Sequence, residues 1–260
     1  MCANQLDVES QHIEPVGLSA QIKSKCFNDG TTVLKGINIE VPPGTFATIL
    51  GRSGVGKSTL LRIIAGLDAD YKGSVIVDGK NVNKPLLNAG IVFQDSRLLP
   101  WMTVTQNIEY GLPNDVDDKV RLERVASIVQ AVGLADSEHK LPRELSGGMQ
   151  RRTALGRALV RSPRILLLDE PFSALDISSK HVMQDLLGAF HRDRNLTTIL
   201  ITHDIEEATY LSDQIFFLID PLHGNIETVE LDSDFERKRC SEQFASNFMK
   251  VSSKAVSCMR

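Results

Sequence analysis

The sequence predicts an α/β fold with a mainly parallel central sheet, and three kinds of segment support this prediction. Short apolar runs at 45–50 (TFATIL), 165–169 (ILLLD) and 197–202 (TTILIT) are typical of strands buried on both faces. Each run is followed by a segment with helical spacing, and strands that alternate with helices form parallel sheets. Two earlier segments, 18–27 and 33–41, alternate between apolar and polar residues and predict an antiparallel β part at the N-terminal side.

The stretch 95–145 has a different pattern and predicts a helical lobe inserted into the α/β core. Its longer segment repeats apolar residues on one helical face: Val120, Val125, Ile128, Val129 and Val132. We therefore expect a polar N-terminal arm (1–16), an α/β ATPase core (17–94 and 146–221), the lobe, and a C-terminal tail (222–260). The tail has a hairpin-like stretch followed by a polar helical segment.

Composition and charge exclude several classes of protein. The formal net charge is −4 and no long block of lysine and arginine occurs, so no nucleic-acid partner is expected. No C-x-x-C spacing occurs among the four cysteines, Cys2, Cys26, Cys240 and Cys258, which we expect to be unpaired thiols. The first residues lack the basic and apolar segments of a secretory signal, and no apolar run is long enough for a membrane span. Any link to a membrane is therefore expected to pass through a partner.

Residues 51–58, GRSGVGKS, match the phosphate-binding pattern G-x-x-x-x-G-K-S. They follow an apolar strand and open a helix, which is the context this pattern requires. The glycines let backbone N–H groups turn towards phosphate oxygens, and the helix N-terminus adds partial positive charge. We expect Lys57 to reach the β- and γ-phosphates and the Ser58 hydroxyl to bind Mg²⁺. The predicted ATP-binding residues here are Gly51, Arg52, Ser53, Gly54, Val55, Gly56, Lys57, Ser58 and Thr59.

Two carboxylates follow the apolar run at 165–168. Asp169 ends this strand and Glu170 comes next, so both lie at the carboxyl edge of the predicted sheet, where ligands bind in such folds. We expect Asp169 to hold Mg²⁺, directly or through water, and Glu170 to polarise the attacking water as general base. Without a P-loop, the same pair could equally be a solvated acidic turn.

The segment 145–150, LSGGMQ, resembles the signature motif of ABC ATPases, which separates them from other P-loop NTPases. Six motifs follow the family order over about residues 18–220. Ser146 can cap the following helix, and the glycines leave its N-terminal amides open as a second anion site. In the family, two subunits pair head to tail. The resemblance therefore implies that Ser146 and Gly148 of one subunit face the ATP of the other, with Gly147 and Gln150 in the same contact.

The resemblance also implies roles for four further residues. Gln94 matches the Q-loop, where its side chain would meet Mg²⁺ or the attacking water and the loop would hinge the lobe. Asp176 ends the D-loop segment SALD, which crosses the dimer interface, and His203 matches the switch histidine at the γ-phosphate. Phe27 lies where the family stacks an aromatic ring on adenine, although a phenylalanine in a sheet is usually a core residue. Because no catalytic position departs from the family pattern, ATP hydrolysis is expected.

The Q-loop region narrows the resemblance. Residues 94–101, QDSRLLPW, are similar to those of the importer subfamily for nitrate, aliphatic sulfonates and taurine, and with the P-loop start GRSG are closest to the aliphatic sulfonate members. Trp101, the only tryptophan, lies where the family groove receives a short helix of the membrane subunit. It is either an apolar anchor for that helix or part of the packing within the lobe.

The resemblance implies a peripheral subunit on the cytoplasmic face of the inner membrane. Its expected partners are a second ATPase subunit, as a homodimer, transmembrane permease subunits and, indirectly, a periplasmic or lipid-anchored solute-binding protein. A soluble ABC ATPase associated with nucleic acid or translation is one alternative. The compact spacing from Gly51 to Ser146 and the single ATPase domain both argue against it. A regulatory module that acts through the C-terminal forty residues is another alternative.

Overall fold

The computed structural model describes residues 14–232, 238–239 and 241–258, and the chain divides into two compact units. One unit, here called the helical unit, contains 88–166 and 171–195, and the other, the nucleotide unit, contains 15–87, 167–170 and the chain from 196 onwards. Residues 1–13 of the predicted arm lie outside the described residues. The arm's last residue, Val16, is buried, and its carbonyl accepts a hydrogen bond from Thr197 Oγ1 at 2.6 Å.

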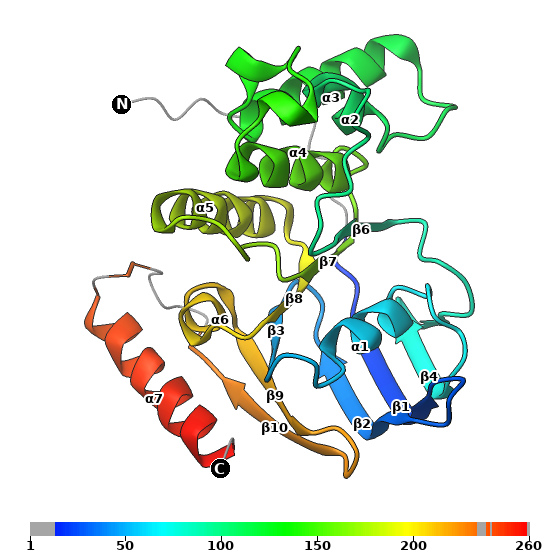
Figure 1. Cartoon of the computed structure of the whole chain (residues 1–260), viewed down its shortest axis with the longest axis vertical. Helices are drawn as coiled ribbons and strands as arrows, with labels where there is room; N and C mark the ends of the chain where they lie inside the picture. The colour runs from blue at the N-terminus through cyan, green and yellow to red at the C-terminus, as the bar shows by residue number, and fades with distance from the viewer. Residues whose placement is uncertain (1–13, 233–237, 240, 259–260) are drawn as a thin grey trace. The chain divides into compact units, whose positions relative to one another are not determined.

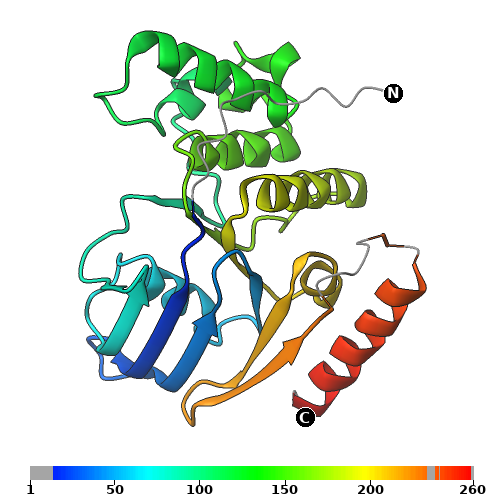
Figure 2. The ribbon, with the colours of Figure 1, turned by 180° about the vertical axis from the view of Figure 1, so that it is seen from behind.

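The nucleotide unit contains the predicted antiparallel part. The strands β1 (Leu18–Cys26), β2 (Thr32–Val41), β4 (Lys72–Val77) and β5 (Lys80–Asn81) pair in the order β2-β1-β4-β5. Strands β1, β2 and β4 lie side by side in Figure 2, from blue to cyan. The order is possible because Gly73 has a φ of 140°, and a Cβ there would lie 2.0 Å from the Gln21 carbonyl oxygen. Only glycine fits this close approach of β4 to β1.

A second sheet forms the core that the apolar runs predict. Its order is β10-β9-β3-β8-β7-β6, where β3 (Phe46–Leu50) runs parallel to both β8 (Thr197–Thr202) and β9 (Gln214–Asp220). The hairpin strand β10 (Asn225–Glu230) is antiparallel to β9. β7 (Ile165–Asp169) starts in the helical unit, to which β6 (Ala89–Val92) belongs, and ends in the nucleotide unit. All residues of β3, β7 and β8 are buried, as continuous apolar strands require.

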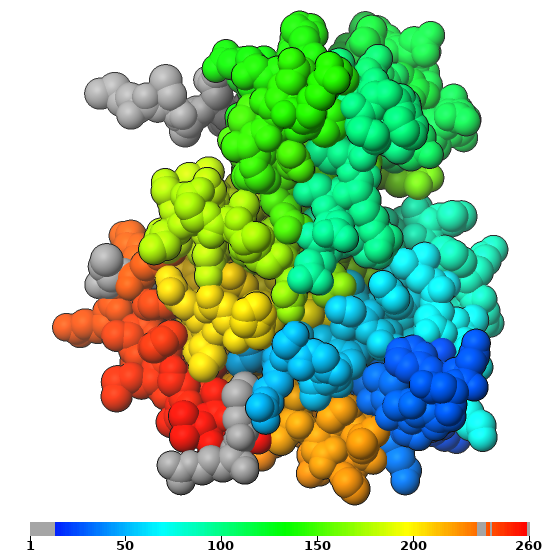
Figure 3. Space-filling view, viewed as in Figure 1, coloured from blue at the N-terminus to red at the C-terminus, as the bar shows by residue number. Residues whose placement is uncertain are grey.

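Three helices pack in the nucleotide unit: α1 (Lys57–Ile64), α6 (Ile205–Leu211) and α7 (Glu242–Cys258) (Figure 1). The helix α7, red at the surface in Figure 3, lies beside the yellow α6. Its buried residues Val251 and Ala255 join a cluster with Leu50 and Phe217. The tail therefore supports the end of β3, the strand that leads into the phosphate-binding segment.

The helical unit contains α2 (Val104–Glu109), α3 (Asp118–Ala131), α4 (Gly147–Leu159), α5 (Ile177–Arg194) and two short 3₁₀ turns at Ala135–Ser137 and Pro142–Glu144. At Gly156, α4 lies so close to α2 and α3 that a Cβ would come within 3.0 Å of Ile108 and 3.1 Å of Ile128. The predicted apolar face of α3 is correct for Val125, Ile128 and Val129 but wrong for Val120, which is exposed. Val120 lies in the first turn of α3, before the buried stretch of the helix begins.

Candidate nucleotide site

The phosphate-binding segment forms a tight loop between β3 and α1. Gly54 and Gly56 have φ angles of 78° and 103°, and Gly56 is the N-cap residue of α1. A Cβ at Gly51 would lie 2.9 Å from the carbonyl oxygen of Leu218 on β9. The two positive φ angles and the close contact strongly favour glycine, because it has no Cβ. The loop is therefore shaped by its glycines, as the sequence pattern indicates.

The Lys57 side chain folds back over this loop. Its Nζ donates to the carbonyl oxygens of Gly51 and Arg52, each at 2.9 Å, and lies 3.9 Å from Glu170 Oε1. The side chain is only 4% exposed. Burial lowers the pKa of Lys57, while the charges of Glu170 and Asp169 oppose this shift. The ammonium is therefore held inside the loop, and an anionic ligand there would favour its charged form.

Ser58 and Asp169 meet across the unit. Ser58 Oγ donates to Asp169 Oδ1 at 2.9 Å, so the first turn of α1 contacts the carboxyl end of β7. Asp169 is 6% exposed. Burial raises the pKa of its carboxyl, as does the charge of Glu170, while the Ser58 hydrogen bond and the cations Arg62 and Lys57 oppose the shift. A hydroxyl and a buried carboxylate side by side are oxygen ligands of the kind that Mg²⁺ prefers.

Glu170 and His203 lie at neighbouring strand ends. Glu170 has a φ of 45°, an uncommon value for a residue with a side chain, and its N–H donates to the Ile201 carbonyl of β8 at 2.9 Å. Oε1 of Glu170 is 3.4 Å from Nδ1 of His203, whose side chain is 60% exposed. Because Leu50 pairs with Thr202, His203 begins its loop beside the phosphate loop. The strained backbone thus turns the Glu170 carboxylate towards both Lys57 and His203.

A buried polar contact supports the His203 loop. Asp204 caps α6 by accepting from the N–H groups of Glu206 and Glu207, as the D-x-x-E spacing predicts for a helix start. Glu207, which is 5% exposed, accepts a hydrogen bond from Thr202 Oγ1, and the same hydroxyl accepts from the Asp204 N–H. His203 therefore stands between two residues that are fixed by buried groups.

The signature segment starts α4 in the helical unit. Ser146 is the predicted N-cap residue and accepts from the N–H of Met149 at 3.3 Å. A Cβ at Gly147 would meet open space, whereas one at Gly148 would lie 3.3 Å from Ser179. The Gln150 amide donates to the carbonyls of Pro142 and Leu145. The Gln150 side chain is therefore held by the residues that lead into α4, and its contact with a partner's nucleotide stays a prediction.

Gln94 and the D-loop share a partner that sequence reasoning missed. Arg151 on α4 donates to the Gln94 carbonyl and lies 3.4 Å from both the carbonyl and the hydroxyl of Ser173. Burial lowers the pKa of Arg151, and the charge of Asp95 opposes this. Asp176 caps α5 by accepting from the Ser179 N–H at 3.0 Å, and hydrogen bonds from the Ser179 side chain and backbone lower the pKa of its carboxyl. Arg151 thus joins the Q-loop to the start of the D-loop within one unit.

Both predicted aromatic contact residues are exposed. The Phe27 ring is 48% exposed and lies in the nucleotide unit, so it is not a core residue of the sheet. Trp101 is 70% exposed in the helical unit, which argues against the alternative that it packs within the lobe. The structure thus brings Lys57, Ser58, Asp169, Glu170 and His203 together in the nucleotide unit. Gln94, Gln150, Asp176 and the signature residues belong to the helical unit.

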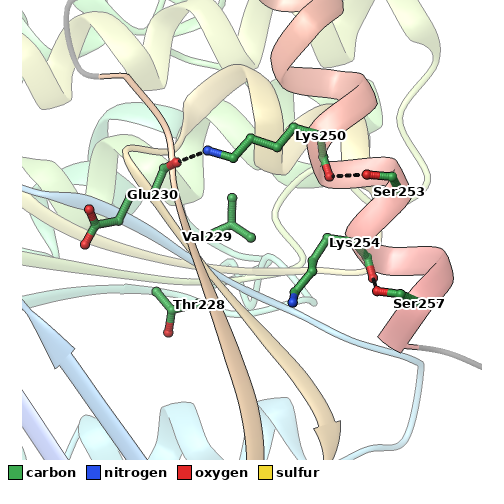
Figure 4. A pocket seen from close by; sticks show the side chains of 7 residues that line it. All are labelled: Thr228, Val229, Glu230, Lys250, Ser253, Lys254 and Ser257. Atoms are coloured by element: carbon green, nitrogen blue, oxygen red, sulfur yellow. Dashed lines mark hydrogen bonds between the residues drawn. The ribbon is translucent and has the colours of Figure 1, made fainter.

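A hollow of about 630 Å³ lies elsewhere in the nucleotide unit, between β10 and α7 (Figure 4). Its lysines are engaged within the chain, because Lys250 donates to the Glu230 carbonyl and Lys254 pairs with Glu227. Ser253 and Ser257 donate to carbonyls of α7 itself. None of the predicted site residues lines this hollow. Among the described residues, we find no helix whose length and hydropathy would suit a membrane span.

These features define a P-loop ATPase of the cassette type. The nucleotide unit has a phosphate loop, an acidic strand end and an adjacent histidine, and the helical unit carries the serine-glycine signature at a helix start. The family model described as ABC transporter matches residues 34–173. The chain belongs to the ABC transporter family and is an ABC-type ATPase.

Similar proteins agree with this assignment. The aliphatic sulfonates import ATP-binding protein SsuB of Bacillus licheniformis is 42% identical over 239 residues, covering 91% of this chain and 93% of that protein. Its namesake from Bacillus subtilis is 47% identical over 206 residues, covering 78% and 80%. A dimeric post-hydrolysis structure of the ATP-binding cassette MJ0796 with ADP and phosphate has a TM-score of 0.73. It is 28% identical and covers 83% of this chain and 99% of that one.

Proposed function

We propose that this chain is the ATP-hydrolysing subunit of an ABC importer that energises uptake of a small anion, such as an aliphatic sulfonate, taurine or nitrate. The observation that carries the ATPase part is the position of Glu170, whose Oε1 lies 3.9 Å from Lys57 Nζ and 3.4 Å from His203 Nδ1. The names of the relatives and the segment 94–101 support the importer part. Nothing observed favours a soluble, nucleic-acid-associated ATPase.

The phosphate loop is the proposed site for the ATP phosphates, and Phe27 is the proposed platform for adenine. The residues present fit Mg²⁺, because the Ser58 hydroxyl and the Asp169 carboxylate already lie 2.9 Å apart at the end of β7. Ser58 and Asp169 would hold the ion, with the Gln94 side chain as a further ligand. When bound, Mg²⁺ neutralises charge on the β- and γ-phosphates.

The chain's own residues then position the reaction. Lys57 Nζ donates into the loop and would shift from the Gly51 and Arg52 carbonyls to phosphate oxygens. The Glu170 carboxylate would accept a proton from the attacking water at Oε1 or Oε2. His203, next to Glu170, would donate from its ring to the γ-phosphate. The strained φ of Glu170 supports this reading, since such strain is often found at catalytic positions.

A second copy of the chain would complete the site. Ser146 already caps α4, and the open space at Gly147 leaves the start of this helix accessible to a phosphate from the partner. We propose a head-to-tail homodimer, with Asp176 near the interface. The two copies would dock on transmembrane permease subunits through Trp101, at the cytoplasmic face of the inner membrane. A periplasmic or lipid-anchored solute-binding protein would deliver the anion.

The ATPase part is tested with purified protein and the variant Glu170→Gln. The amide keeps the size of the side chain but cannot act as a base, so turnover should fall by about 100-fold or more. ATP affinity should stay close to that of the unchanged protein, and ATP should drive dimerisation on a sizing column. Brisk hydrolysis by Glu170→Gln would refute the assignment of the base.

The importer part needs the whole assembly. The chain is reconstituted in proteoliposomes with the permease and the solute-binding protein encoded beside it. Uptake of an aliphatic sulfonate, taurine and nitrate is then compared at equal ATP. ATP-dependent uptake of at least one of these anions is expected. Robust ATPase activity without uptake of any of them would overturn the choice of solute class.

A further inference from the structure

Lys25 is a buried lysine that the ATPase mechanism does not use. It lies near the end of β1, two residues before Phe27, and only 4% of its side chain is exposed. Lysines are almost never this buried unless they are paired. Here Nζ donates to Asp68 Oδ1 at 2.9 Å, to the Asp70 carbonyl at 2.6 Å and lies 3.4 Å from Asp70 Oδ2. These acceptors match the three N–H groups of an ammonium.

The two aspartates connect Lys25 to the helix that starts at the phosphate loop. Asp68 follows α1, and its N–H donates to the Arg62 carbonyl in the last turn of that helix at 3.2 Å. The Asp68 carboxylate also accepts from the Asp70 N–H at 3.0 Å, so a hydrogen bond holds the two aspartates relative to each other. The end of β1 is thereby tied to α1 through a charged contact in which the Lys25 side chain is buried, while the side chains of Asp68 and Asp70 are 22% and 82% exposed.

Lys25 also lies over one face of the Phe27 ring. Its Nζ is 5.9 Å from the ring centroid, within the range of a cation–π contact. The backbone at Phe27 is held separately, because its N–H donates to the Thr31 carbonyl and its carbonyl accepts from Gly30, both at 2.9 Å. With the backbone held and one face turned to the ammonium, the exposed part of the ring can meet a ligand.

Charge is retained at Lys25 despite its surroundings. Burial alone would lower its pKa, but the hydrogen bonds and charges of Asp68 and Asp70 outweigh burial and raise the pKa above its ordinary value. The ammonium is therefore a permanent cation at neutral pH.

We infer that Lys25 is a positioning residue for the nucleotide base: held by Asp68 and Asp70, it fixes the Phe27 ring so that the opposite face is presented to a purine. This inference rests on the proposed role of Phe27 in ATP binding. It assigns to Lys25 an effect on the base only, because its contacts reach the ring and the C-terminal end of α1. The phosphate loop lies at the other end of that helix.

The test compares ligands with and without a base. Affinities of the full chain for ATP and for inorganic tripolyphosphate are measured by calorimetry, without added metal, for Lys25→Met and for the control Lys23→Met. Lys23 lies on the same strand with an exposed side chain. We expect Lys25→Met to weaken ATP binding about 5- to 10-fold, a fraction of the stacking contribution, while tripolyphosphate binding stays unchanged. Lys23→Met should change neither affinity.

Two further variants separate the possible failures. Phe27→Ala should weaken ATP but not tripolyphosphate, and adding Lys25→Met to it should cause no further loss. Unchanged ATP affinity in Phe27→Ala would remove the proposed base platform itself. The role of Lys25 would be overturned if ATP affinity fell in Phe27→Ala but not in Lys25→Met. It would also be overturned if Lys25→Met lowered the affinities for ATP and for tripolyphosphate equally. If Lys25→Met does not fold, Asp68→Asn carries the same test, with a smaller ATP-specific loss expected.

Discussion

The Ser58 hydroxyl donates to Oδ1 of Asp169 at 2.9 Å, although 111 positions separate the two residues in the sequence. The contact joins the first turn of α1 to the carboxyl end of β7, so that a hydroxyl and a carboxylate lie next to each other beside the phosphate loop. Both are oxygen ligands suited to a hard divalent cation. The relationship makes the Mg²⁺ dependence of nucleotide binding a property that single substitutions can isolate.

Ser58→Ala should uncouple ATP binding from Mg²⁺. The variant loses the hydroxyl ligand and the partner of Asp169, so the gain in ATP affinity on adding Mg²⁺ should shrink by at least about tenfold. Affinity in the presence of a chelator should stay the same, because Lys57 and the loop amides remain. Titration with a fluorescent ATP analogue, with and without Mg²⁺, measures both quantities. Ser58→Thr, which keeps a hydroxyl, is the control. If Ser58→Thr loses as much of the Mg²⁺ effect as Ser58→Ala, the hydroxyl is not the ligand.

Asp169→Asn should stabilise the nucleotide-free protein at neutral pH. Burial and the charge of Glu170 raise the pKa of Asp169 above the ordinary 3.8, so the ionised form costs stability once the pH lies above the folded-state pKa. That cost disappears as the pH falls through the raised value and towards 3.8. The stability advantage of Asp169→Asn should therefore be present at about pH 7 and smaller at about pH 4, close to the ordinary pKa of the carboxyl.

Urea unfolding at the two pH values measures this, and Asp176→Asn supplies a control of opposite sign. The side-chain contact with Ser179 lowers the pKa of Asp176, so its ionised form adds stability that is lost only as the pH falls through the lowered value. Asp176→Asn should therefore lose some stability at neutral pH. A change in stability of the same sign in both variants would contradict the opposite directions of the two pKa shifts.

The positions of the main site residues could be predicted because each follows a local signal. Asp169 ends an apolar run, Ser146 precedes a helical segment, and Gly56 with Lys57 marks the loop-to-helix turn. In each case, a strand end or a helix cap fixes the backbone within a few residues of the functional group. The signal that places each of these residues lies within a few positions of it in the sequence, so the local pattern suffices.

Contacts between elements that are far apart in the sequence could not be predicted from it. Nothing near Lys25 indicates that its ammonium is bonded at Asp68 and Asp70, since the partners differ by 43 and 45 positions. Arg151 is one of several arginines on α4, and its contacts with Gln94 and Ser173 have no signal in the sequence. Such contacts depend on how elements pack, and periodicity says only which face of an element is apolar.

Glu207→Ala should weaken both the fold and the switch loop. The substitution leaves the buried Thr202 hydroxyl without its acceptor, and a hydrogen bond to a charged group of this kind contributes about 2 kcal/mol. The free energy of unfolding in urea should fall by at least that amount, and hydrolysis should slow because His203 is no longer held between fixed neighbours. Glu207→Gln keeps an acceptor and should lose less of both. Equal effects of the two variants would show that charge, not the hydrogen bond, matters here.

Trp101→Ala should separate ATPase activity from transport. Because the side chain is 70% exposed, its removal should change the free energy of unfolding by less than about 0.5 kcal/mol. ATP hydrolysis by the free subunit should also persist, because Lys57, Glu170 and His203 belong to the other unit. A tryptophan that anchors a partner helix contributes about 2 kcal/mol or more to binding, so association with the permease and coupled uptake should fall sharply.

Tyr110→Ala is the matched control for this last variant. Tyr110 is 65% exposed and follows α2 in the same helical unit. The substitution therefore removes a comparable exposed aromatic ring that is close to Trp101 in the sequence. We expect coupled uptake to remain in Tyr110→Ala and to be lost in Trp101→Ala, measured in proteoliposomes at equal ATPase content. If free-subunit ATPase and uptake fall in parallel in Trp101→Ala, the ring acts through the fold of the helical unit. The exposed indole would then have no role in docking.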